Sequence, residues 1–134
     1  RRAVVGWDNG RLAMLLAVFD ARCGLRFGMR DVYLSVCGGY RITEPAGDLA
    51  AAAAAASALL DKPFPKGAVF FGEVALSGAI RPVGRLEPRL REAARLGFTT
   101  AFVPAGAPET VDGMTVRGLS RLQDLVDVLG GGSE

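Results

Sequence analysis

The spacing of apolar residues along the chain predicts four helices. Over residues 85–96, apolar side chains repeat at the helical period and share one stripe. Pro88 fits only the first turn of such a helix, which places its start between Gly84 and Glu87, and Gly97 can end it in the left-handed conformation. The other helices are expected at 11–22, with Asn9 as the N-cap and Gly24 at the end, at 45–60, and after an N-cap at Ser120.

Short runs of β-branched and aromatic residues predict the strands. In the middle of the chain, Ala68–Phe71 followed by Gly72, Glu73 and Val74 is typical of one strand. Leu76-Ser77-Gly78 then reverses the chain into a second strand. The other strand segments are expected at 2–5, 31–36 with a continuation at 40–42, 79–83, 99–103 and 114–117. This mixture indicates an α+β fold in which small sheets pack against about four helices.

The length and composition indicate a single globular domain. The chain has 134 residues, half of them apolar, which is enough for one hydrophobic core. We expect the domain to span 1–129 and the residues 130–134 to form a disordered tail. Because the chain starts at Arg1 and not at Met, we expect it to be a piece of a longer protein. It has no signal-peptide pattern and no apolar run that could span a bilayer, so we expect a cytoplasmic protein without a membrane partner.

Residues able to carry chemistry are few. The sequence has no histidine, which excludes a Ser-His-Asp triad and a histidine-ligated metal. Cys23 and Cys37 lack metal-ligand spacing and are expected to be packed, reduced thiols. No glycine-rich phosphate loop occurs, so we expect no ATPase activity, cofactor or metal in this chain. All but two of the 16 Lys and Arg residues are Arg, but a net charge of +2 does not by itself indicate a polyanionic partner.

Three blocks of the sequence carry a family resemblance. They are VVGWDNGRLAMLLAVFDARCG at 4–24, DVYLSVCGGYRITEPAGDLAAAAA at 31–54 and FGEVALSGAIRPVGRLEPRLREAARLGF at 71–98. The second and third blocks resemble the Lon proteolytic domain. All three resemble more closely the Lon-like C-terminal domain of the RadA (Sms) family of bacterial DNA repair proteins. The resemblance implies the Lon proteolytic-domain-like fold, also described as ribosomal protein S5 domain 2-like.

The resemblance also implies that a catalytic dyad has been lost. The Lon domain uses a serine that is activated by a lysine. The serine position corresponds here to Ala46 and the lysine position to Glu87, so we expect no catalytic residue and no enzyme activity in this chain. Two serines could serve in a displaced dyad, Ser57, which is five residues from Lys62, and Ser77 in a turn. Neither has a base at helical spacing, and a Lon-type peptidase with displaced groups is kept as an alternative.

The acidic residues of the second block have a simpler interpretation. Glu44 and Asp48 lie near the start of the predicted helix 45–60, where negative charge is favourable. Glu73 is interpreted as a polar residue at a strand turn. The run of alanines at 50–56 is interpreted as a buried helix that allows close approach of its neighbours.

The RadA resemblance implies a role for the whole parent protein. That protein would be a DNA-dependent ATPase with ATP, Mg and Zn bound in a part that precedes this chain. It would form a hexameric ring, contact single-stranded or branched DNA during branch migration and DNA break repair, and have the RecA recombinase as a candidate partner. The residues expected to contact DNA are arginines before the alanine-rich helix and around the third block: Arg41, Arg81, Arg85, Arg89, Arg91 and Arg95.

Other interpretations of these arginines stay open. They could form a solvated face, with Glu87 pairing with Arg91 at i,i+4, or a face that bridges subunits. Trp7, Tyr33 and Tyr40 are too few and too scattered in the sequence to indicate base stacking. A pure oligomerisation or peptide-binding scaffold is therefore the third candidate.

Overall fold

The structure is a computed structural model, and it describes residues 1–130. Helices and strands are mixed along the chain, and the strands are short. Their order is β1 (Arg2–Val5), α1 (Asn9–Val18), β2 (Val32–Ser35), α2 (Asp48–Leu60), β3 (Ala68–Phe70), β4 (Glu73–Val74), β5 (Ile80–Arg81), α3 (Leu86–Arg95), β6 (Thr100–Pro104), β7 (Thr110–Val111), β8 (Met114–Leu119) and α4 (Leu122–Leu129).

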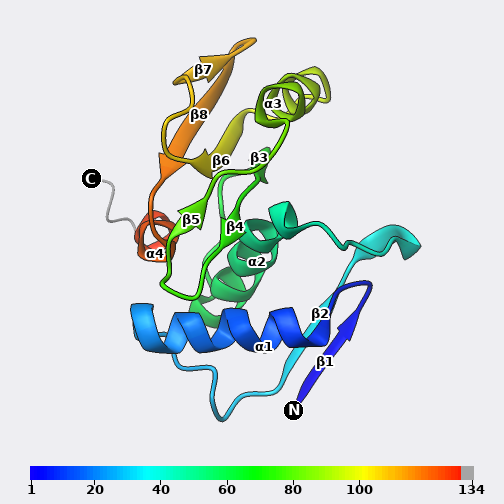
Figure 1. Ribbon diagram of the computed structural model, residues 1–134, viewed down its shortest axis with the longest axis vertical. Helices are drawn as coiled ribbons and strands as arrows, with labels where there is room; N and C mark the ends of the chain where they lie inside the picture. Colours follow the sequence, from blue (N-terminus) through cyan, green and yellow to red (C-terminus); the bar gives the residue numbers. More distant parts are fainter. Residues whose placement is uncertain (131–134) are drawn as a thin grey trace.

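The strands form three small sheets (Figure 1). In the largest, the order is β3-β6-β8-β7; β3, β6 and β8 run parallel, and β7 is antiparallel to β8. β1 pairs in parallel with β2, from Arg2 opposite Val32 to Val5 opposite Ser35. β4 and β5 form an antiparallel hairpin. The predicted α+β class, with small sheets and four helices in the described residues, is confirmed.

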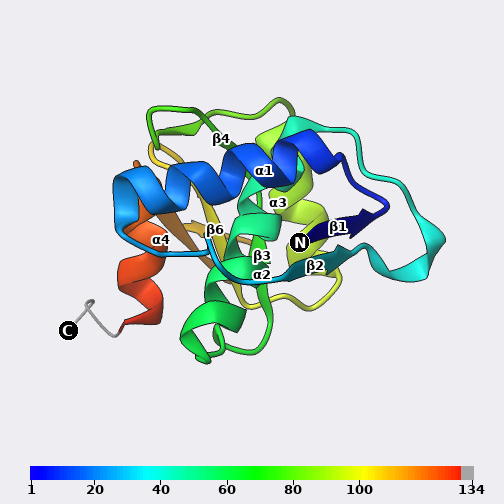
Figure 2. The same ribbon diagram turned by 90° about the horizontal axis from the view of Figure 1, so that it is seen from below.

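The alanine-rich helix α2 lies at the centre of the molecule, with α1 on one side and the four-stranded sheet on the other (Figures 1 and 2). Ala52, Ala53, Ala55 and Ala56 are buried, so the interpretation of a buried helix is confirmed for this face. Short side chains let α4, β3 and β4 approach α2 closely. The main core joins these elements, and a second core lies between α3 and the sheet around Leu90.

The predicted N-cap of the first helix was wrong by one residue, and the helix begins at Asn9 and not at about residue 11. Asp8 is the N-cap of α1, because its Oδ2 accepts a hydrogen bond from the backbone N–H of Arg11 at 2.9 Å. The helix ends in a π-helical turn over Phe19–Cys23, and Gly24 follows with φ of 68° as predicted. Asn9, the predicted cap, is the first residue inside the helix.

The predicted strand 68–74 is divided into two strands that belong to different sheets. Between them, Gly72 bonds to the start of α2: its N–H donates to the carbonyl of Ala46 at 3.0 Å, and its carbonyl accepts from the N–H of Leu49 at 3.0 Å. Both backbone groups of Gly72 are therefore unavailable to a sheet. A Cβ at this position would lie 3.0 Å from Cγ2 of Ile80, so only glycine fits without a shift.

Three further predictions about the elements need correction. Residues 40–42 do not continue β2, because Gly38 and Gly39 have φ of 85° and 73° and turn the chain. β8 is longer than predicted and reaches Leu119. Ser120 is not the N-cap of α4. Its N–H and that of Arg121 instead donate to Oδ2 of Asp124 at 2.9 and 3.0 Å.

Two remaining predictions concern the C-terminal tail and the two cysteines. Residues 131–134 of the predicted tail lie outside the described residues. Both cysteines are free thiols, as predicted, and Cys23 is partly buried. Cys37 is exposed, so the prediction that it is packed was wrong.

Candidate functional site

A groove of about 390 Å³ opens at the start of α2, where the resemblance places the serine of the Lon dyad. It is walled by the loop after β2, the first turn of α2, the end of β3 and the side of α3. Arg41, Glu44 and Arg89 bring charged groups to this groove, and Phe70 and Phe71 bring aromatic ones. We call it the α2 groove.

Ala46 lies in this groove, but Glu87 is not among its described lining residues. Ala46 is 8% exposed, and its carbonyl accepts a hydrogen bond from the N–H of Gly72. Glu87 is in the exposed first turn of α3, where it pairs with Arg91 at 3.1 Å. The two positions that the resemblance assigns to the dyad therefore present a methyl group and a carboxylate already engaged by a cation.

The serines considered for a displaced dyad are engaged with the backbone. The hydroxyl of Ser57 donates to the carbonyl of Lys62 at 2.5 Å. The hydroxyl of Ser77 accepts from the N–H of Ala79 at 3.3 Å, inside the turn before β5. Among the hydrogen bonds of residues 1–130, none joins a serine hydroxyl to a lysine ammonium group. Within the described residues, neither hydroxyl is therefore hydrogen-bonded to a lysine that could activate it.

A buried ion pair below the α2 groove was missed by sequence reasoning. The side chain of Asp48 is 1% exposed and accepts two hydrogen bonds from Arg11, one from Nε at 2.9 Å and one from Nη2. Its Oδ2 also accepts from the N–H of Val74 at 3.0 Å. The bond to Asp48 raises the pKa of Arg11 above its ordinary value. Asp48 thus joins α1, α2 and the β4–β5 hairpin, and is more than the helix-end charge that was predicted.

Arg89 and Arg41 meet in the α2 groove although they are distant in the sequence. Arg89 is fixed from two sides: its Nη2 donates to Oε2 of Glu44 at 2.6 Å and its Nε to the carbonyl of Gly84 at 2.9 Å. Arg41 is exposed and has no ion pair within the described part of the chain. The two arginines and Glu44 leave one net positive charge at the groove.

The other predicted arginines do not form one continuous face. On a helix, Arg89 and Arg91 are separated by about 160° around the axis, so they point to different sides of α3. Arg91 pairs with Glu87, as predicted for the solvated alternative, and Nε of Arg95 donates to Glu92 at 2.9 Å. That bond lowers the pKa of Glu92.

Like Arg41, two other arginines of the predicted set, Arg81 and Arg85, have no ion pair within residues 1–130. Arg85 precedes α3 with a left-handed φ of 59° and is exposed. Arg81 lies on β5 opposite Glu73 and borders a separate hollow together with Arg11. The structure therefore brings Arg41 and Arg89 together, leaves Arg85 next to α3, and places Arg81 apart.

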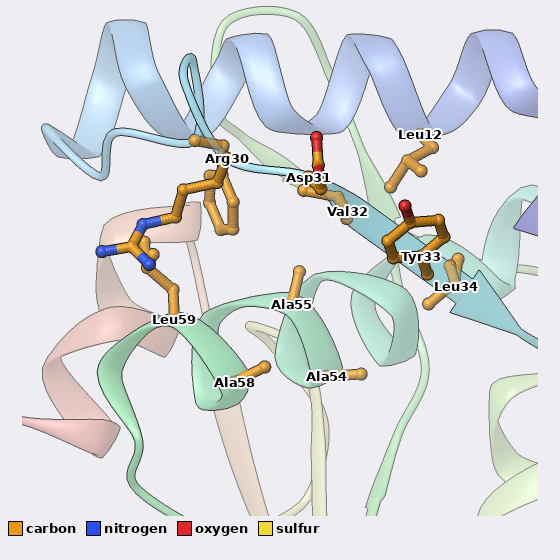
Figure 3. A pocket seen from close by; sticks show the side chains of 11 residues that line it. Leu12, Arg30, Asp31, Val32, Tyr33, Leu34, Ala54, Ala55, Ala58 and Leu59 are labelled. Carbon is orange, nitrogen blue, oxygen red and sulfur yellow. The ribbon is translucent and has the colours of Figure 1, made fainter. Parts of the chain in front are cut away.

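A second hollow, of about 310 Å³, lies between β2 and α2 (Figure 3). It exists because α2 presents mainly alanines here, with Leu59 at one end: Ala55 points toward β2, and Ala54 and Ala58 flank it. Methyl groups are too short to fill the space under the strand. None of the six arginines predicted to contact DNA lines this hollow in the described structure, and Arg30 and Asp31 at its rim were not singled out from the sequence.

Comparison with known proteins places the chain in a family. The model of the family described as subunit ChlI of Mg-chelatase matches residues 23–107. The chain therefore belongs to this family. Within the bacterial proteins compared, it is homologous to DNA repair protein RadA over nearly its whole length. The predicted resemblance to RadA is confirmed.

Three relatives illustrate the extent of this homology. The chain is 58% identical to DNA repair protein RadA of Brucella abortus (strain 2308) over 109 residues, which cover 81% of the chain and 23% of that protein. For the Rickettsia bellii (strain RML369-C) protein the identity is 45%, covering 97% of the chain and 29% of the relative. For the Escherichia coli (strain K12) protein it is 44%, covering 96% and 28%. The chain thus spans less than a third of the curated relatives it matches.

Two negative observations apply to residues 1–130. No helix in that range has both the length and the apolar character needed to cross a membrane. No cluster of three or more His, Cys, Asp or Glu in the same range is arranged to hold a metal ion.

Proposed function

We propose that this chain is a non-catalytic Lon-like domain of a RadA-type DNA repair protein, and that it contacts DNA through the α2 groove. One observation carries the proposal: Arg41 and Arg89, from two separate blocks of the sequence, lie in the same groove. Arginine forks suit phosphate oxygens, and Arg89 is already held in place by Glu44 and Gly84. The names of the relatives, DNA repair protein RadA, support a repair role.

The rest of the proposal concerns the parent protein. In this proposal, the parent protein is a cytoplasmic, DNA-dependent ATPase. It binds ATP, Mg and Zn outside this chain and forms a hexameric ring. It processes single-stranded or branched DNA in branch migration and break repair, with RecA as a candidate partner. A single copy of the α2 groove offers few phosphate contacts, so binding by one copy is weak, and the ring strengthens it by avidity.

DNA binding by the full-length protein that contains this chain tests the proposal. Arg41→Ala/Arg89→Ala should weaken binding of single strands, and the slope of log affinity against log salt should fall by about 0.7 for each phosphate that is no longer bound. Arg91→Ala/Arg95→Ala removes the same charge from the opposite side of α3 and should leave the slope unchanged. An unchanged affinity and slope in the Arg41/Arg89 variant, with its melting temperature intact, would refute contact through this groove.

A specific apolar surface favours assembly as a second function. Beside the α2 groove, Val69, Phe71, Leu96 and Phe98 line a hollow of about 450 Å³. Leu96 is 61% exposed and extends this apolar lining to the surface, and contiguous exposed apolar surface is typical of interaction sites. If this surface joins subunits, Leu96→Glu should shift sedimentation of the full-length protein toward smaller species. Exposed Leu76→Glu, on the β4–β5 turn, is the matched control.

A further inference from the structure

Tyr40 is a large aromatic residue that the fold holds at the surface. It follows the two glycines after β2, and 73% of its side chain is exposed. Its ring lies against Gly38, since a Cβ placed on Gly38 would be 2.8 Å from Cε2 and 2.9 Å from Cδ2 of the ring. Gly38 also has a φ of 85°, which other residues rarely adopt. The backbone of a glycine thus supports one side of the ring and leaves most of the remainder open.

The backbone of the Tyr40 loop is held in place by contacts with Gly6. A Cβ on Gly6 would lie only 2.6 Å from the carbonyl oxygen of Tyr40, so the loop and the end of β1 are in close contact. The N–H of Ile42 donates to the carbonyl of Gly6 at 2.8 Å and fastens the other side of the loop. Tyr40 is therefore an exposed ring on an anchored loop.

The next residue in the chain is Arg41, which lines the α2 groove together with Arg89. Tyr40 therefore places an exposed ring one residue along the chain from a groove arginine. Such a pair matches the two parts of a nucleotide, because unpaired bases stack on aromatic rings and phosphates bind to guanidinium groups. Paired bases are already stacked inside a duplex and cannot use such a ring. The sequence shows the neighbouring Tyr40 and Arg41, and the fold adds Arg89 to the groove that Arg41 lines.

We infer that Tyr40 is a stacking platform for an unpaired base, and that it selects single-stranded over duplex DNA at the α2 groove. The inference rests on the proposed DNA contact and specifies its substrate class. Arg41 and Arg89 hold the phosphates, and Tyr40 contributes through the face of its ring. Its hydroxyl plays no part, so phenylalanine can replace it.

Affinity measurements on the full-length protein test this role. Tyr40→Leu retains apolar contact with Gly38 but has no aromatic face, and it should weaken binding of an oligo-dT strand about fivefold or more while leaving duplex binding unchanged. The salt slope should stay the same, because both arginines still bind phosphates. Tyr40→Phe should bind like the unmodified protein. Tyr33→Leu, which alters the other exposed tyrosine, on β2, should have no effect.

The possible outcomes separate this inference from the proposed function. Equal single-strand affinity in Tyr40→Leu and the unmodified protein overturns stacking and leaves the arginine contact standing. Equal loss on single strands and duplex also overturns it, because that pattern shows a general effect on the loop. If the Arg41/Arg89 variant and the unmodified protein bind DNA equally, the proposed function fails, and the role of Tyr40 at this groove fails with it.

Fluorescence offers a readout that a purely structural role would not change. The native Trp7 is 4% exposed and provides a constant background. In Tyr40→Trp, the added indole should be quenched when oligo-dT binds, since stacked bases quench it, whereas duplex of the same length should quench it much less. Tyr33→Trp supplies a control at a site of similar exposure, since Tyr33 is 65% exposed. Quenching that is the same for both tryptophan variants would contradict stacking at residue 40.

Discussion

Arg11 holds Asp48 by two hydrogen bonds across the contact between α1 and α2. The carboxylate is buried and also accepts from the N–H of Val74, so one side chain fixes three elements below the α2 groove. Arg11 itself is partly exposed, with 30% of its side chain accessible. Among the described residues, Arg11 is the cation that pairs with the buried Asp48 carboxylate, and the elements around the α2 groove depend on this pair.

Loss of this partner should destabilise the fold strongly. Arg11→Met leaves the Asp48 carboxylate buried without a cation, which typically costs about 3 kcal/mol or more in the free energy of unfolding. Arg26→Met removes an arginine from an exposed pair with Asp20 and should change the same quantity by less than about 1 kcal/mol. Urea unfolding of both variants measures the difference. Similar values for the two would contradict the importance of the buried pair.

The glycine behind the Tyr40 loop should not tolerate a methyl group. Gly6 has a φ of 82°, and its Cβ would lie 2.6 Å from the carbonyl oxygen of Tyr40 and 2.8 Å from Cβ of Val36. Gly6→Ala should therefore lower the free energy of unfolding by more than the about 1–3 kcal/mol expected from backbone strain alone. Gly39→Ala is the matched control, because its φ is 73° and nothing lies within 4 Å of the added atom. Thermal melts of the two proteins should rank in that order.

The two thiols should differ in reactivity. Burial raises the pKa of Cys23, and the carboxylate of Asp127 raises it further. Cys37 is exposed. At pH 8, iodoacetamide should therefore alkylate Cys37 first and Cys23 slowly, because the thiolate is the reactive form. In Cys37→Ser only the slow reaction should remain, and a fast reaction in that variant would show that Cys23 is accessible.

The raised pKa of Cys23 also predicts how stability depends on pH. A folded-state pKa above the unfolded value means that the contribution of the thiol is fully present below about pH 8.5 and is lost as the pH rises through the folded-state pKa. The advantage of the unmodified protein over Cys23→Ala in the free energy of unfolding should shrink between pH 8 and 10. Urea unfolding at several pH values measures it. An advantage that grows over this range would contradict the sign.

The protein should not hydrolyse peptides. Ala46 offers no nucleophile, and the hydroxyls of Ser57 and Ser77 are engaged with the backbone. Casein and a fluorogenic peptide incubated for a day should show no turnover above buffer. Activity that disappears in Ser57→Ala or Ser77→Ala would establish a displaced dyad. Ala46→Ser/Glu87→Lys need not restore activity, since the groups that stabilise an oxyanion must also be present.

The elements that could be predicted correctly are those whose ends are fixed by local residues such as proline and glycine. The start of α3 near Pro88 and its end at Gly97 follow from backbone restrictions that hold in any context. The N-cap of α1 was harder, because Asp8 and Asn9 are adjacent and both suit the position. The division of 68–74 could not be predicted, because it depends on Gly72 bonding to the distant start of α2.

The site was predictable in its residues but not in its arrangement. Arg41 and Arg89 could be named from the sequence, yet their meeting in one groove depends on how α3 packs beside the first turn of α2. Asp48 carried one local signal, an acidic residue at the start of an alanine-rich helix, and this signal favoured a helix-end charge. Its burial follows from Arg11, for which neither spacing nor motif gives a cue.

The parallel pairing of β3, β6 and β8 determines when the domain can fold during its own synthesis. Parallel strands cannot be joined by a tight hairpin, so each pair must wait for the segment between them. β8 and α4 follow the other described elements in the chain, and they supply Leu119, Leu122 and Leu125 to the main core around α1 and α2. A nascent chain that stops before β8 therefore exposes the apolar faces of those helices, and folding is completed only as the end of the domain leaves the ribosome.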